Sequence, residues 1–199
     1  MNIMILGGFL GSGKTTVLLE IVEYVSKSIP DSNKVKVAVI ENEIGDISID
    51  GPAIAAHGLN VRNISNGCVC CTLSTDLVTG AKSIMETINP AWLIVETTGL
   101  AYPGKVSKLI EDFIPYESLR TVVIVDAERF TELYDILKPL VTGQITGSDR
   151  VLLNKSDLAS DTVLENTLVM LTQINPAAEI IPVSAKTGLD EDVLRWIVG

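Results

Sequence analysis

The sequence has few of the residues that mark secreted or membrane-spanning proteins. Among its 199 residues only three are cysteines, too few and too close together to form a disulfide framework. No uninterrupted apolar stretch reaches the roughly 20 residues that a transmembrane helix needs. No basic segment precedes the first apolar run, as it would in a signal peptide. We therefore expect a cytoplasmic protein that does not act at a membrane.

Positive charge is also scarce. The chain has 15 lysines and arginines against 25 aspartates and glutamates, which gives a formal net charge of -10. Such a chain repels the phosphates of DNA and RNA, so we expect no nucleic-acid partner. Hydrophobic residues make up 47% of the sequence and occur in short Val, Ile and Leu runs. These runs are typical of parallel strands that are covered on both faces.

Apolar strands alternate with amphipathic helices along the whole chain. We expect irregular structure at 44–66, where Gly, Asn and Asp are frequent. The alternation predicts an α/β fold with a mainly parallel sheet, helices on both faces and one domain over 1–199. The expected strands are 2–6, 35–40, 92–95, 121–126, 150–153 and 180–183, and the expected helices are 14–28, 73–88, 105–113, 130–141, 162–174 and 191–197.

The first strand is followed by a phosphate-binding loop. Residues 8–15 match G-x-x-x-x-G-K-[ST] at every fixed position, between a strand and a helix. Backbone N–H groups of such a loop and the N-terminus of the following helix attract phosphates. The alternative interpretation is a glycine-rich turn that binds no ligand. We expect Lys14 to bridge the β- and γ-phosphates and Thr15 to ligate Mg²⁺ in a three-layer P-loop NTPase fold. The predicted phosphate-binding residues are Gly8, Gly11, Ser12, Gly13, Lys14, Thr15 and Thr16.

A polar motif after the fifth strand is a candidate for recognising the base, although four polar residues after a strand are often only a turn. In Asn154-Lys155-Ser156-Asp157, the Asp157 carboxylate can accept both the N1–H and the 2-amino group of guanine. Adenine lacks this pair of donors, and a site built this way discriminates by about 10⁴-fold or more. Ser184-Ala185-Lys186 follows the next strand, where a loop covers the base. The two motifs predict GTP and GDP as the ligands.

A third motif, Glu96-Thr97-Thr98-Gly99, follows the third strand. We expect Glu96 to hold Mg²⁺ through water and the Gly99 N–H to sense the γ-phosphate, which couples hydrolysis to loop movement. Lys14, Thr15, Glu96 and Gly99 are therefore the predicted catalytic set. No side chain is evident for positioning the attacking water, so we expect slow turnover, about 10⁻⁴–10⁻² s⁻¹.

The three cysteines form one cluster, Cys68, Cys70 and Cys71. Three thiolates this close can bind one Zn²⁺, Co²⁺ or similar ion, and a tetrahedral site then needs a fourth ligand. Burial as three small hydrophobic residues and a redox pair are the alternatives. The candidates for the fourth ligand are Glu41, Glu43, His57 and a water molecule.

An acidic motif, Glu41-Asn42-Glu43, ends the second strand and begins the irregular segment. A segment in this place, beside the phosphates, is where a switch loop belongs. Its carboxylates can serve the Mg²⁺ of the nucleotide or a second metal. A solvated acidic turn is the alternative.

Together these motifs resemble the CobW-type GTPases, metal chaperones related to the nickel-insertion GTPases of hydrogenase and urease maturation. The resemblance rests on 8–16, 41–45, 67–71, 96–101 and 154–157, which follow one another in family order. It implies GTP hydrolysis coupled to the binding and delivery of a transition metal, with the cysteine motif as the metal site. The implied partners are a client metalloenzyme or cofactor-assembly protein, and a second copy of the chain in a nucleotide-dependent homodimer.

The chain departs from the family pattern in two places. Tyr102 stands where the family usually has Asp, and Ile44 stands where it has an aromatic residue. We also expect the 199 residues to hold the GTPase domain without the usual C-terminal domain, either as a natural short form or as a piece of a longer chain. Two other functions stay open at this point. One is a GTPase chaperone that gates assembly or reactivation of a corrinoid or other metallo-cofactor enzyme without carrying metal. The other is a nucleotide-gated interaction module without turnover.

Overall fold

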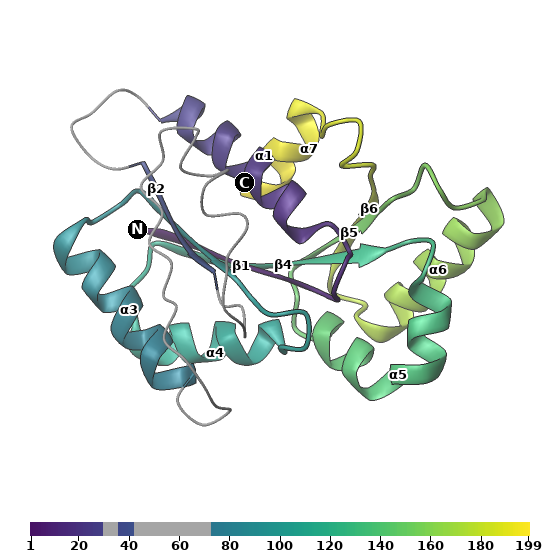
Figure 1. Cartoon of the computed structure of the whole chain (residues 1–199), viewed down its shortest axis with the longest axis horizontal. Helices are drawn as coiled ribbons and strands as arrows, with labels where there is room; N and C mark the ends of the chain where they lie inside the picture. Colours follow the sequence, from purple (N-terminus) through teal and green to yellow (C-terminus); the bar gives the residue numbers. More distant parts are fainter. Residues whose placement is uncertain (30–35, 42–72) are drawn as a thin grey trace.

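The computed structural model describes residues 1–29, 36–41 and 73–199, and its strands there form one parallel sheet (Figure 1). The strand order is β2-β3-β1-β4-β5-β6, and each neighbouring pair runs parallel. The predicted α/β class is therefore confirmed. The strands are β1 (Asn2–Gly8), β2 (Val37–Glu41), β3 (Trp92–Glu96), β4 (Ser118–Asp126), β5 (Arg150–Asn154) and β6 (Glu179–Pro182).

Helices cover both faces of the sheet, which gives three layers (Figure 1). One face packs against α1 (Lys14–Ser28) and α7 (Glu191–Val198). The opposite face packs against α3 (Leu73–Thr87) and α4 (Pro103–Phe113) on one half, and α5 (Phe130–Ile145) and α6 (Asp161–Ile174) on the other. Within the described ranges, no helix is both long and apolar enough to cross a membrane.

The central strand β1 shows why the sequence reads as a continuous apolar run. Met4 and Leu6 pack into the cluster beneath α1, whereas Ile3 and Ile5 pack into the cluster beneath α3 and α4. Successive residues of a strand point to opposite faces of the sheet, and helices cover both faces here. All four side chains are therefore fully buried. Each contributes about 1.5–3 kcal/mol of hydrophobic burial. The carboxyl end of β1 is thereby fixed in the middle of the sheet.

Most elements begin or end one to four residues from their predicted bounds, and three of these differences have a clear physical cause. β4 begins at Ser118 rather than at 121, because Ser118 pairs with Asn2 at the start of β1. α4 begins at Pro103 rather than at 105, since proline is favoured in the first turn of a helix. α5 continues past 141 to Ile145, with non-helical dihedrals at Leu137 two residues before its internal proline.

Candidate nucleotide site

The predicted nucleotide motifs meet at the carboxyl edge of the sheet. β1 ends at Gly8 next to β4, and Glu96 at the end of β3 is in register with Leu6 of β1. Asp126 at the end of β4 is in register with Asn154 at the end of β5. Open α/β sheets bind ligands at this edge, where helix N-termini and loops converge.

The phosphate loop needs its glycines for two reasons. The backbone has positive φ at Gly8 (139°), Gly11 (78°) and Gly13 (98°), where other residues are strained. A Cβ on Gly8 would overlap the carbonyl oxygen of Ile124, and a Cβ on Gly13 would overlap the side-chain amide of Asn154. The loop therefore lies directly on β4 and β5, with its backbone closely held. This cradle fits a phosphate group.

Lys14 begins α1 and lies inside the turn of the phosphate loop. Its Nζ donates to the carbonyl of Phe9 at 3.3 Å, and the residue is only 8% exposed. Ser12 is buried in the same loop, and its hydroxyl has no hydrogen-bond partner among the described residues. A lysine and a buried hydroxyl beside the N-terminus of α1 are suited to an anionic ligand.

The two predicted magnesium residues lie side by side. The Thr15 hydroxyl donates to Oε1 of Glu96 at 3.4 Å, although the residues are 81 positions apart. Glu96 is 8% exposed and ends the buried strand β3. A hydroxyl and a carboxylate are the oxygen ligands that Mg²⁺ prefers, so this pair fits the ion.

Gly99 lies directly against the phosphate loop. A Cβ on Gly99 would come within 2.8 Å of the backbone nitrogen of Leu10. Gly99 belongs to a turn that closes with a hydrogen bond from the Ala101 N–H to the Thr98 carbonyl at 3.1 Å. The turn therefore borders the phosphate cradle, as a segment that senses the γ-phosphate must.

The two base motifs are joined by side-chain hydrogen bonds. The Asn154 amide, 3% exposed, donates to the Ser12 carbonyl at 2.8 Å and accepts from the Ala185 N–H at 2.9 Å. The Ser184 hydroxyl donates to Oδ1 of Asp157 at 2.7 Å. Asp157 and Lys186 are exposed at the rim of the site. The geometry thus brings 154–157 and 184–186 together beside the phosphate loop.

Asp126 is a site residue that sequence reasoning missed. Its Oδ2 lies 2.6 Å from Nζ of Lys155, and its Oδ1 accepts the backbone N–H groups of Glu128 (3.1 Å) and Arg129 (3.2 Å). It is 4% exposed. Its position at the carboxyl end of a buried strand was the available signal. Lys155 has a φ of 63°, so this ion pair anchors a backbone conformation that is uncommon for lysine.

The predicted transition-metal ligands lie outside the described residues. Cys68, Cys70, Cys71 and Glu43 fall in 42–72, as does His57. The backbone of Glu41 is described, and it pairs in register with Glu96 at the edge of the sheet. In the ranges that the structure covers, no three His, Cys, Asp or Glu side chains form a metal-binding group.

The chain is similar to known proteins that are named zinc chaperones or zinc-regulated GTPases. The zinc chaperone YjiA of Escherichia coli is 30% identical over 194 residues, covering 92% of this chain and 57% of the relative. Zinc-regulated GTPase metalloprotein activator 1 of Dictyostelium discoideum is 27% identical, covering 91% of this chain and 45% of the relative. The crystal structure of Zn(II)-bound YjiA GTPase from Escherichia coli superposes with a TM-score of 0.67 at 26% identity, covering all of this chain and 61% of that one. The chain thus spans about half the length of these curated relatives.

The parallel sheet, the glycine cradle and the Thr15–Glu96 pair define a P-loop nucleotide-binding domain. Residues 2–182 match the nucleotide-binding domain of the CobW/HypB/UreG family. The chain belongs to this family, which confirms the resemblance seen in the sequence.

Proposed function

We propose that this protein is a GTP-hydrolysing metallochaperone that binds a transition metal at Cys68, Cys70 and Cys71 and delivers it to a client metalloenzyme. Zn²⁺ and Co²⁺ are the preferred ions, with Glu41 or Glu43 as additional ligands. GTP and Mg²⁺ bind at the carboxyl edge of the sheet. Hydrolysis there releases the ion.

One structural relationship carries the coupling between the two sites. β2 ends at Glu41, whose Cα is in register with that of Glu96, and the chain continues from Glu41 toward the cysteine motif. Glu96 lies 3.4 Å from the Thr15 hydroxyl. β2 therefore ends next to the residues that suit Mg²⁺, and the sequence that follows Glu41 contains the cysteines. This proximity supports a nucleotide-dependent metal site.

The family and the names of its members support this function. The Escherichia coli relative is named a zinc chaperone, and the Dictyostelium relative is named a zinc-regulated GTPase metalloprotein activator. The family model describes a nucleotide-binding domain. Metal delivery agrees with these names better than a chaperone that carries no metal.

Residues of this chain supply the groups that bind the nucleotide and stabilise its charge. Lys14, within the phosphate loop, neutralises charge on the β- and γ-phosphates. Thr15 and Glu96 would hold Mg²⁺, which would stabilise the negative charge that develops on the phosphates during hydrolysis. Asp157, oriented by the Ser184 hydroxyl, reads the guanine base. When the γ-phosphate leaves, the Gly99 N–H loses its partner and the turn that contains Gly99 can move.

Elemental analysis of the purified chain, with GDP and with a non-hydrolysable GTP analogue, tests the proposal. We expect about one bound transition-metal ion per chain with the analogue. A variant with Cys68, Cys70 and Cys71 all changed to serine should keep GTP binding and lose the metal. Wild-type protein without stoichiometric metal under both conditions would favour a GTPase chaperone that gates its client without carrying an ion.

A further inference from the structure

The C-terminal end of α5 holds the turn that contains Gly99. The side-chain amide nitrogen of Gln144 donates to the Gly99 carbonyl at 2.8 Å and to the Ala101 carbonyl at 3.2 Å. Gln144 is 3% exposed, so these bonds form away from competing water. One buried side chain thus binds two carbonyls of the same turn.

The turn itself fixes the direction of the Gly99 N–H. The Thr98 carbonyl, which belongs to the same peptide group as that N–H, accepts from the Ala101 N–H at 3.1 Å. Gln144 binds two further carbonyls of the turn, those of Gly99 and Ala101. Because the Thr98 and Gly99 carbonyls and the Ala101 N–H all have partners, the turn cannot rotate its peptide groups without breaking hydrogen bonds.

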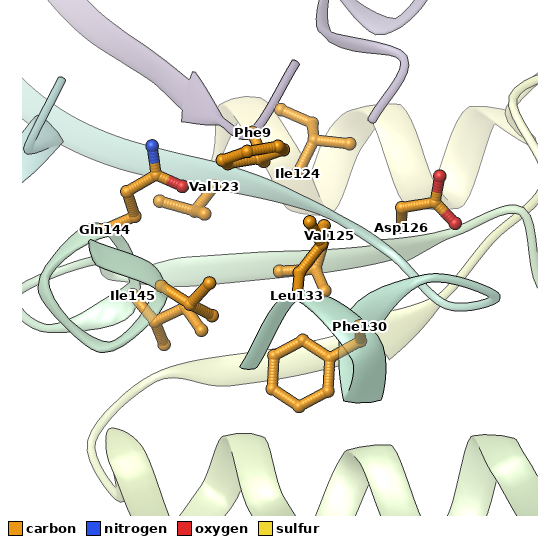
Figure 2. A pocket seen from close by; sticks show the side chains of 10 residues that line it. Phe9, Val123, Ile124, Val125, Asp126, Phe130, Leu133, Gln144 and Ile145 are labelled. Carbon is orange, nitrogen blue, oxygen red and sulfur yellow. The ribbon is translucent and has the colours of Figure 1, made fainter. Parts of the chain in front are cut away.

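Gln144 also lies next to the phosphate loop. It lines a small cavity of about 20 Å³ together with Phe9, and Figure 2 shows the two side chains on the walls of this cavity. Phe9 is the residue whose carbonyl accepts from Lys14. Gln144 therefore lies beside both the phosphate loop and the Gly99 turn.

A second contact fastens the same turn to α5. Tyr102 follows the turn, and its ring fills the space beside Gly143, where a Cβ would overlap the ring. Gly143 precedes Gln144 in the helix, so two successive positions of α5 hold both ends of the segment from Gly99 to Tyr102. Gly143 and Gln144 thereby connect the end of α5 to the start of α4 at Pro103.

We propose that Gln144 is a positioning residue for the γ-phosphate: it holds the Gly99 turn in the conformation whose N–H faces that group. This inference rests on the proposed function, because it assumes that Gly99 contacts the γ-phosphate of GTP. GDP lacks this phosphate, so the loss of Gln144 must weaken GTP binding selectively. A side chain that only stabilised α5 would affect both nucleotides equally.

The test uses Gln144→Met, which keeps the length of the side chain and removes both donors. Affinities for fluorescent GDP and for a fluorescent non-hydrolysable GTP analogue are measured on the full chain with Mg²⁺. We expect the analogue to bind roughly 5- to 10-fold more weakly than to the wild type, the equivalent of losing a hydrogen-bonded contact. GDP affinity should change by less than about twofold.

Asn175→Leu provides a matched control in the same region. Asn175 is also a buried amide that donates to two carbonyls, of Ile145 and Ser148, both at 2.9 Å, but it does not contact the Gly99 turn. The Asn175→Leu variant should have a lower melting temperature and an unchanged ratio of GTP-analogue affinity to GDP affinity. An equal change of that ratio in Gln144→Met and Asn175→Leu would overturn the positioning role.

Two further measurements keep the inference testable if Gln144→Met does not fold. Gln144→Glu keeps the shape and places acceptors against the two carbonyls, so it should show the same selective loss. In the wild type, amide hydrogen exchange at 99–101 should be slower with the GTP analogue than with GDP. Equal exchange in both states would contradict the inference. A wild type that does not bind the GTP analogue at all would instead refute the proposed function.

Discussion

The side-chain amide of Asn154 donates to the carbonyl of Ser12 across 2.8 Å, and this bond joins the base-recognition motif to the phosphate loop. The same side chain accepts from the Ala185 N–H at 2.9 Å. One buried residue thus connects three segments of the chain. Asn154 is 142 positions from Ser12 and 31 positions from Ala185. The nucleotide site is held together by this bridge independently of any ligand.

Asn154→Ala should therefore weaken both the fold and the site. It leaves the Ser12 carbonyl and the Ala185 N–H without partners, which costs about 1–3 kcal/mol in the free energy of unfolding. GTP and GDP affinities should fall together, because the bridge positions parts of the site common to both. Chemical denaturation and nucleotide titration measure these effects. Asn166→Ala, at an exposed position of α6, should leave both unchanged.

Asp157→Asn should change the base that the site accepts. The amide can no longer accept two hydrogen bonds from guanine, whereas it can donate to the 2-oxygen of xanthine. We expect GTP affinity to fall by orders of magnitude, on the scale of the ~10⁴-fold discrimination of such sites, and xanthosine triphosphate to bind better than GTP. Glu165→Gln removes one exposed charge from α6 as a control. Unchanged GTP affinity in Asp157→Asn would refute the assignment of the base.

Glu96→Gln should alter the dependence on magnesium. The substitution keeps the hydrogen bond with Thr15 and removes the charge that attracts the ion. We expect hydrolysis to need a higher Mg²⁺ concentration and to fall at least about tenfold at low Mg²⁺. Glu132→Gln, on the exposed face of α5, is the matched control. A magnesium titration of GTP hydrolysis that is identical in wild type and Glu96→Gln would argue against this metal role.

Gly143→Ala tests the packing of Tyr102 on α5. Alanine normally stabilises a helix by about 1 kcal/mol relative to glycine. Here its Cβ would overlap the ring of Tyr102, so we expect a loss of about 1–3 kcal/mol instead. Adding Tyr102→Ala should remove the overlap and recover the helix contribution of the alanine. A stabilised Gly143→Ala single variant would contradict the observed packing.

Much of the fold could be predicted because it depends on local patterns. The run of apolar residues in β1 and the glycine loop after it identify a buried strand and a phosphate cradle without tertiary information. The end of α5 could not be predicted in the same way. A proline at 139 indicates a helix that ends or kinks, and only packing against α4 and β4 shows that the helix continues to Ile145.

The candidate site also contains residues that local motifs predict and residues that only tertiary contacts reveal. Lys14, Thr15, Asn154 and Asp157 belong to motifs whose spacing reflects their chemistry, so the sequence alone predicts them. Gln144 belongs to no motif, and its role depends on a turn more than 40 positions away. The metal-binding role of the cysteines stays a prediction, because they lie outside the described residues.

The most direct test of the account is a titration of the full chain with Zn²⁺ or Co²⁺, once with GDP and once with a non-hydrolysable GTP analogue. Linkage requires that GTP tightens metal binding by the same factor by which the metal tightens GTP. We predict that the metal binds roughly 5- to 150-fold more tightly with the analogue, the usual range of such coupling. Equal metal affinities in the two nucleotide states would contradict delivery of the ion by GTP hydrolysis.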